Sequence, residues 1–316
     1  MTKKYEDLEK SYQNNPTDIN LVEIARRQVL DLDFPSAIGS LDQALAEEEK
    51  TKETSKARRA SIYYEKGKIA NLQLEYQKAK DYFSKAVELA PQTFEYNMSF
   101  GNIMITIGDF GFAQKLYKDA LLLAQDDKEK GDVLNNLGTI YLSTKEYDKV
   151  ILNLEEALSL YSKTLAEDSP SIAATLDNLG LALKRNGKID EAIVCHKKAL
   201  AKFRESLGDE HPSTARAYNN FASALLIKEE FYKAAENYDR SLNIKLKLYG
   251  EDHPAVASTL SNLGAIYLTI GENRHALEMT EKALKIFAKH LPAGHSNIAG
   301  IQHNIEIIKA AIAAEK

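Results

Sequence analysis

An asparagine recurs at one offset in four successive segments of the chain, and a fifth continues the series: Asn136, Asn178, Asn220, Asn262 and Asn304. A side-chain amide offers both a hydrogen-bond donor and an acceptor, so a row of amides can pair with the N–H and C=O groups of an extended peptide. The same amides could instead join neighbouring elements and brace the fold. The column therefore predicts a main-chain-binding surface, with bracing as the alternative. Asn135 and Asn219 directly precede two of its members.

Hydrogen bonds alone would not give such a surface useful affinity. Each contributes about 1 kcal/mol net, and four would only approach the roughly 4 kcal/mol of millimolar binding. Candidate anchors fall at matching offsets, the apolar ones being Leu181, Leu226, Ile227 and Leu268 and the basic ones Lys184, Arg185 and Arg216. Together with Asp177 these charges sum to +2, which favours a mildly acidic peptide. Ordinary solvated charge is the alternative.

The histidines give no comparable signal for catalysis or metal binding. His211 and His253 recur with the repeating pattern of the chain, so we expect junction or capping roles for them. His196 stands in a column of mostly bulky apolar residues and is expected to be a hydrogen-bonded core histidine. Three others have spacings of five and eight, which do not match helical i, i+4 ligand pairs: His290, His295 and His303.

Catalytic sequence motifs give no positive signal either. The sequence has no phosphate-binding glycine loop, nucleophile elbow or zinc-protease motif. A single cysteine, Cys195, excludes an internal disulfide and a cysteine-rich zinc site. We therefore expect a protein that is not an enzyme and that uses no metal or cofactor.

The recurrence of these residues reflects a repeat that runs through the chain. A small residue marks the middle of each unit, with steps of 42, 34, 37, 42, 42 and 42 residues: Ala25, Gly67, Gly101, Gly138, Gly180, Ala222 and Gly264. Twelve residues later stands a second small or slim residue: Ala37, Ala79, Ala113, Val150, Ala192, Ala234 and Ala276. Seven residues further stands a third: Ala44, Ala86, Ala120, Ala157, Ala199, Ser241 and Ala283. Spacings of three, four and seven define one helix face, and small residues let helices approach closely.

Each unit is therefore expected to be two helices joined by a tight turn. Gly108, Gly187 and Gly271 fall between the two expected helices of their units. Proline stands where a first helical residue would, with acidic residues before it, at Pro170, Pro212 and Pro254. These turn and junction residues support the same division of the chain.

The combined pattern resembles the tetratricopeptide repeat, with Gly or Ala, Tyr, Ala, Phe or Tyr, Ala and Pro at its characteristic offsets. Residues 63–91 are similar to the ordinary 34-residue form. The units spaced by 42 resemble the longer form of kinesin light chains, including the Asp-Glu-His-Pro (209–212) and Glu-Asp-His-Pro (251–254) junctions. We expect the eight extra residues to lengthen the second helix and the following loop. The long heptad coiled coil of the light chains is not matched before the repeats, so only the repeat mechanics are carried over.

The resemblance implies an all-α superhelix, a solenoid of about seven helix-turn-helix repeats with terminal capping helices. The expected parts are a capping helix over 1–16, repeats over 17–50, 55–91, 92–125, 129–165, 170–207, 212–249 and 254–291 within the range 17–296, and a capping helix over 297–316. In such arrays the first helices line a concave surface, and asparagines at the place of our column grip ligand main chain in related repeats. The C-terminal helix is expected to cover Leu263, Tyr267 and Leu284.

Composition narrows the class of protein and partner. Hydrophobic residues make up 44% of the 316 residues, enough for a continuous core, and the formal charge of −5 gives no reason to expect nucleic acid or an anionic membrane as partner. We expect a cytoplasmic monomer, with a homo-oligomer as the alternative. Its expected role is that of a non-catalytic adaptor or scaffold that binds an extended, mildly acidic segment of a partner protein in the concave groove. A self-associating structural module and a regulatory subunit of an enzyme complex are the alternative functions.

Overall fold

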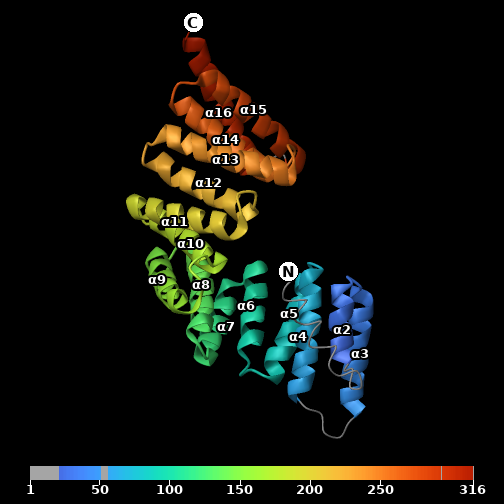
Figure 1. Cartoon of the computed structure of the whole chain (residues 1–316). Coiled ribbons are helices and arrows are strands. Elements are labelled where there is room, and N and C mark those ends of the chain that lie inside the picture. Colours follow the sequence, from blue (N-terminus) through green and yellow to red (C-terminus); the bar gives the residue numbers. More distant parts are fainter. Residues whose placement is uncertain (1–20, 51–55, 293, 316) are drawn as a thin grey trace. The chain divides into compact units, whose positions relative to one another are not determined.

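The computed structural model describes residues 21–50, 56–292 and 294–315 (Figure 1). Fifteen helices span these residues with no strand among them, which confirms the all-α prediction. The helices form seven antiparallel pairs followed by one further helix: α2 (Leu21–Leu30) with α3 (Phe34–Lys50), α4 (Lys56–Leu72) with α5 (Tyr76–Leu89), α6 (Phe94–Thr106) with α7 (Phe110–Leu123), α8 (Asp127–Ser143) with α9 (Tyr147–Thr164), α10 (Pro170–Arg185) with α11 (Ile189–Leu207), α12 (Pro212–Ile227) with α13 (Phe231–Tyr249), α14 (Pro254–Thr269) with α15 (Asn273–His290), and α16 (Ser296–Ala314). The capping helix predicted over 1–16 lies outside the described residues.

Two compact units divide the chain, the first ending at Gln125 and the second beginning at Asp126. The first unit contains the pairs from α2 to α7, and the second contains α8 to α16. Within each unit, the second helix of one pair packs against the first helix of the next. Each unit is therefore a stack in which every pair shares its core with its neighbours.

Each of these pairs is held by a small residue of the first helix facing a larger one of the second helix, sixteen positions later. A Cβ atom placed on Gly101 would lie 2.6 Å from the ring of Tyr117, and one on Gly138 would lie 2.6 Å from Leu154. Such distances are shorter than ordinary Cβ contacts, so alanine at either of these two positions would force the facing side chain to shift. The small columns thus set the spacing between paired helices.

The 42-residue units differ from the shorter units mainly in their second helices. The second helices α11 and α13 contain 19 residues against 14 in α5 and α7, whereas the first helices α10, α12 and α14 contain 16 residues, between the 13 of α6 and the 17 of α4. The expectation that the extra residues lengthen the second helix is confirmed. The longer second helix adds a column of aromatic side chains. Tyr161, Phe203 and Phe287 form this column and are buried, while Lys245 stands at the same position of α13.

The turn inside each described pair has one residue in the left-handed backbone region, seven positions after the first small column. Glycine fills this place in three pairs, with φ of 85°, 80° and 82° at Gly108, Gly187 and Gly271. Four pairs place a larger residue there, with φ between 60° and 63°: Leu32, Leu74, Lys145 and Glu229. A side chain in this region costs about 1 kcal/mol or more. The packing of the two helices, rather than glycine itself, therefore imposes the turn.

The last helix, α16, closes the second unit on its C-terminal side. Ile298, Ile301 and Ile305 are buried against α14 and α15, where they meet Leu260 and Phe287. The expected contacts of this helix were wrong in part, since Leu284 packs against this cluster but two other predicted residues do not. Those two, Leu263 and Tyr267, belong to the cluster formed with α12 and α13.

Candidate functional site

The recurring asparagines lie on the first helices of the second unit. Successive first helices pack side by side along the stack, as α8 does with α10 and α10 with α12 (Figure 1). The 42-residue step places the side chain of the column at the same turn of each helix. All five are half-buried: Asn136, Asn178, Asn220, Asn262 and Asn304. We call the surface formed by these five residues the asparagine face.

Asn220 braces two neighbouring repeats. Its Nδ2 donates to Oδ2 of Asp177 on α10 at 3.0 Å, and the carboxylate of Asp177 is fully buried. Nδ1 of His196 lies 2.9 Å from the other carboxylate oxygen, and Nε of Arg216 lies 3.4 Å from Oδ2. Counting Asp177 as a surface charge was therefore wrong, because its carboxylate sits in the interior and is engaged by three side chains.

His196 is the core histidine that its column indicated, with one ring nitrogen bonded. The imidazole lies against Gly180, where a Cβ would come within 2.7 Å of the ring. Nδ1 is paired with Asp177, whereas Nε2 is buried without a hydrogen-bond partner among the described residues. The glycine in the first helix is thus needed to seat this ring.

The other amides of the asparagine face differ in what they contact. Asn178, Asn262 and Asn304 make no side-chain hydrogen bond to any described residue, and neither does Asn219. Asn136 already has an interaction partner. The face therefore combines a bracing asparagine with three amides whose donors and acceptors remain available.

A pocket of about 400 Å³ opens at one end of the asparagine face, between α14 and α16. Amide, hydroxyl and imidazole groups line most of it: Ser258, Ser261, Asn262, Asn297, His303 and Asn304. Sequence analysis found the two column asparagines but missed the serines and His303. Ser258 and Ser261 lie four and one positions before Asn262, so the helical period relative to the column was the available signal.

The predicted anchors are partly engaged by the fold itself. Nζ of Lys184 donates to Ser223 Oγ on α12 at 2.8 Å. Burial lowers the pKa of the Lys184 ammonium, and the neighbouring Arg185 guanidinium lowers it further. Arg185 and Arg216 are exposed. Polar and cationic groups therefore remain accessible near Asn178.

The four apolar candidate anchors also differ in how exposed they are. Leu181 and Leu268 are half-buried. Leu226 is also half-buried and packs on the core of the α12–α13 pair. Ile227 is exposed at the end of its helix. The structure therefore brings no compact apolar pocket together from these four residues.

The junction histidines cap helices. Nδ1 of His211 accepts the backbone N–H of Ser213, and Nδ1 of His253 accepts that of Ala255, both at 3.1 Å. Their predicted capping role is confirmed. His295 caps α16 in the same way, which sequence analysis missed although it lies 42 residues after His253. A proline at the first helical position follows the cap in α12 and α14.

No group of three or more His, Cys, Asp or Glu side chains among the described residues is arranged to hold a metal ion. No helix in the described part of the chain has both the length and the apolar character to cross a membrane.

Comparison with protein families identifies the repeat. One protein family described as "Tetratricopeptide repeat" matches residues 171–246 and 218–289. A second family with the same description matches residues 60–93 and 131–164. Together these ranges cover more than half of the chain. The chain belongs to the tetratricopeptide repeat family. Repeats of this family serve in general as non-enzymatic scaffolds for protein interaction.

Solved tetratricopeptide structures share the fold at low sequence identity. A tetratricopeptide repeat protein from Parabacteroides merdae is 16% identical, with a TM-score of 0.62 over 92% of this chain and 97% of its own. BtubC (BKLC) from P. vanneervenii is 23% identical, with a TM-score of 0.57 over 77% and 96%. A Podosopora anserina putative kinesin light chain with nearly identical repeats is 24% identical, with a TM-score of 0.51 over 57% and 86%. No curated protein matches the chain significantly.

Proposed function

We propose that this tetratricopeptide repeat chain is a non-catalytic adaptor that binds an extended segment of a partner protein along the asparagine face. The observation that carries the proposal is the pocket between α14 and α16, where the unpartnered amides of Asn262 and Asn304 meet. An extended chain presents N–H and C=O groups in alternation, and side-chain amides can satisfy both. Asn178 offers the same pair of groups two repeats earlier.

The charges near the face favour a mildly acidic segment. Arg185 and Arg216 are exposed, and the half-buried ammonium of Lys184 lies between the same two helices, α10 and α12. Asp177 is buried under Asn220, so its carboxylate presents no charged surface that would repel an acidic ligand. Long-range attraction of this kind mainly raises the association rate and selects among partners.

We also propose that the 42-residue units belong to the kinesin-light-chain type of tetratricopeptide repeat. The His-Pro junctions support this assignment, since each histidine caps the helix that its proline begins, in α12 and in α14. The likeness to the Podosopora anserina protein supports it as far as fold is concerned.

Peptide selection with matched variants tests the proposal. Twelve-residue peptides selected on the whole chain would be measured against Asn262→Ala/Asn304→Ala, with Asn243→Ala on the exposed side of α13 as control. Each lost hydrogen bond costs about 1 kcal/mol, so we expect the double variant to weaken binding by tens of fold and to keep its melting temperature. Peptides that bind this variant and the control equally well would remove the pocket from the site.

A further inference from the structure

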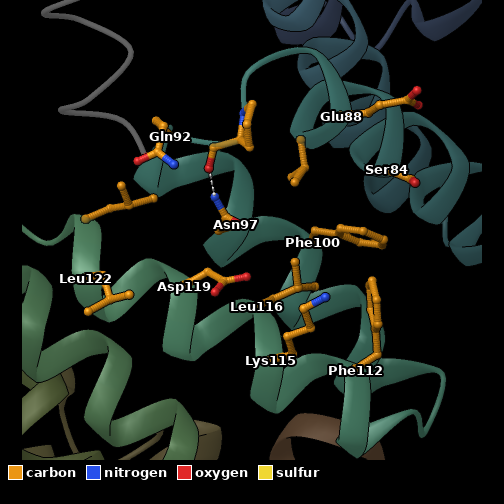
Figure 2. A pocket seen from close by; sticks show the side chains of 13 residues that line it. Ser84, Glu88, Gln92, Asn97, Phe100, Phe112, Lys115, Leu116, Asp119 and Leu122 are labelled. Atoms are coloured by element: carbon orange, nitrogen blue, oxygen red, sulfur yellow. Dashed lines mark hydrogen bonds between the residues drawn. The ribbon is translucent and has the colours of Figure 1, made fainter.

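Equivalent grooves lie between successive second helices, on the side of the stack away from the asparagine face. One lies between α11 and α13 and another between α13 and α15, each with a first helix as its floor. A third lies between α5 and α7 in the first unit (Figure 2). The small columns align the repeats, so positions along the helices of one groove have counterparts in the others. The grooves can therefore be compared residue by residue.

The α11–α13 groove is filled by charged side chains that bond to one another. Arg204 forms an ion pair with Asp209, and Lys247 forms one with Glu210. The guanidinium of Arg240 lies 5.9 Å from the ring centroid of Tyr218 on the floor. These contacts leave a cleft of about 270 Å³.

The α13–α15 groove has apolar side chains at the corresponding positions. Forty-two residues after Arg204 stands Leu246, and Leu260 replaces Tyr218 on the floor. Leu242, Val256 and Met279 complete a cleft of about 600 Å³. No described residue fills it, so a continuous apolar surface is left open there. An apolar surface of this kind on a folded protein usually marks an interaction site.

Three lysines form a basic edge along this groove. Lys282, Lys285 and Lys289 follow one another at spacings of three and four on α15, which places them on one helix face. Lys282 is paired with Glu278 and Lys289 with Asp252. Lys285 is exposed and has no ion-pair partner among the described residues. Lys285 therefore supplies an unpaired ammonium at the centre of the edge, and Glu251 and Asp252 also line the groove.

The groove of the first unit shows that this basic edge is not a general property of the repeat. There Asp119 stands at the position of Lys282, and Leu122 at the position of Lys285. Figure 2 shows Asp119, Leu116 and Leu122 along α7, with Glu88 on the opposite side of the cleft. The charged residues that line the groove of the first unit are Glu88, Asp119 and Lys115, a net charge of −1. Those that line the α13–α15 groove are Lys282, Lys285, Lys289, Glu251 and Asp252, a net charge of +1, so an acidic ligand is favoured in the second groove and not in the first.

We propose that the α13–α15 groove docks an amphipathic helix of a partner protein whose edge is acidic. Met279 and Lys289 are ten residues apart on α15, about 15 Å, which accommodates roughly three turns of a docked helix. An amphipathic helix lays apolar side chains at i, i+3, i+4 and i+7 into such a groove, here against Leu246, Leu260 and Met279. Carboxylates at the same spacing along its edge face the lysines. This site is independent of the asparagine face and of the ligand proposed for it.

Designed helical peptides test the charge and the apolar contact separately. The probes are fluorescein-labelled helices with one fixed leucine stripe, carrying Glu, Gln or Lys at the edge positions, and anisotropy is measured against the full chain. The Glu peptide is expected to bind at least tenfold more tightly than the Lys peptide. Lys285→Glu should reverse that order without changing the melting temperature, since the side chain is exposed.

Two further variants separate the groove from other surfaces. Leu246→Arg introduces the residue found at the equivalent position 204 and should abolish binding of the Glu peptide, whereas Leu122→Arg in the groove of the first unit should leave it unchanged. The proposal fails if no peptide binds, if Glu and Lys peptides bind alike, or if Leu122→Arg is as damaging as Leu246→Arg. It also fails if light scattering shows a dimer that Leu246→Arg converts to monomer, because the occupant is then a second copy of the chain.

Discussion

The second helices α5 and α7 end after 14 residues, whereas α11 and α13 continue to 19. Both kinds share one inner contact, in which a glycine or alanine of the first helix faces a larger side chain sixteen positions later, as Gly67 faces Phe83. The long pairs add a second contact beyond it. Tyr161 shows the arrangement, since its ring lies against Gly131 of α8, where a Cβ would come within 2.7 Å. The inner contact is thus common to all pairs, and the outer one belongs to the long pairs.

The outer contact is also where one long pair departs from the others. Lys245 occupies the aromatic column in α13, and its Nζ donates to Thr259 Oγ1 on α14 at 2.7 Å. Burial lowers the pKa of this ammonium to about 8, with no carboxylate to oppose the effect. The α12–α13 pair therefore keeps the length of the long form without its aromatic packing.

Removing an outer aromatic side chain should give the largest effect. Phe203→Ala leaves a cavity among Ala173, Ala215 and Tyr218 and should destabilise the second unit by about 3–5 kcal/mol. Urea unfolding followed by circular dichroism measures the change. A loss under about 1 kcal/mol would mean that the inner contact alone holds the long pairs together.

Restoring the aromatic column should stabilise the chain. Lys245→Phe replaces a desolvated ammonium by the side chain of the equivalent positions 203 and 287, with an expected gain of about 2 kcal/mol. Hydrogen exchange of α13 and α14 should slow accordingly. A destabilised variant would show that the bond between Lys245 and Thr259 outweighs the buried charge.

The half-buried ammonium of Lys245 also predicts how the stability of the wild-type chain, compared with Lys245→Phe, depends on pH. The pKa of Lys245 is about 8 in the folded chain against 10.5 when unfolded, so the unfolded chain binds more protons between these values. Wild-type stability should therefore rise with pH across this window, and the advantage of Lys245→Phe should shrink. Melting temperatures of both proteins at pH 7.5 and pH 10 check the trend, and a constant difference would contradict it.

Two asparagines of one face should respond differently to alanine. Asn220→Ala removes a donor from the buried carboxylate of Asp177 and should cost roughly 1–3 kcal/mol. Asn178→Ala breaks no side-chain hydrogen bond within the described residues and should leave the melting temperature unchanged. Equal effects in thermal unfolding would remove the distinction between bracing and open amides.

The smallest expected effect concerns the turns, which are shared by short and long pairs. Glu229→Gly and Leu74→Gly relieve a side chain at positive φ and should each stabilise the chain by about 1 kcal/mol. Lys228→Gly, one position earlier and in the ordinary helical region, is the matched control and should destabilise. Denaturant midpoints of the three variants give the comparison.

The parts of the structure that could be predicted from sequence are those encoded in a local period. Spacings of three, four and seven gave the helices, and the small columns gave the close contact between paired helices, as at Gly138 and Leu154. The junction prolines and His211 likewise carry their meaning in neighbouring residues. These features can be predicted without knowing which repeats are in contact.

Other features depend on contacts between repeats and left no local signal. Nothing next to Asp177 in the sequence indicates that Asn220, 43 residues later, would bury its carboxylate. Glu229 and Lys145 do not look like turn residues, since only their place in the column puts them at positive φ. The asparagine column left two interpretations open, because bracing and open amides have the same residue type and spacing.

The same His-Pro dipeptide stands before α12 and before α14, at 211–212 and 253–254, so the 42 residues from Pro212 to His253 form a unit that could be removed in register. Excising residues 212–253 would join His211 to Pro254, restoring the same dipeptide before a helix of the same length. Nδ1 of His211 would then meet the N–H of Ala255 as it now meets that of Ser213, and Phe203 would face Ala257 instead of Ala215. Removal or duplication of one such unit would therefore keep the flanking helices in register. Such a change in array length would leave the contacts of the terminal helix α16 with α15 intact.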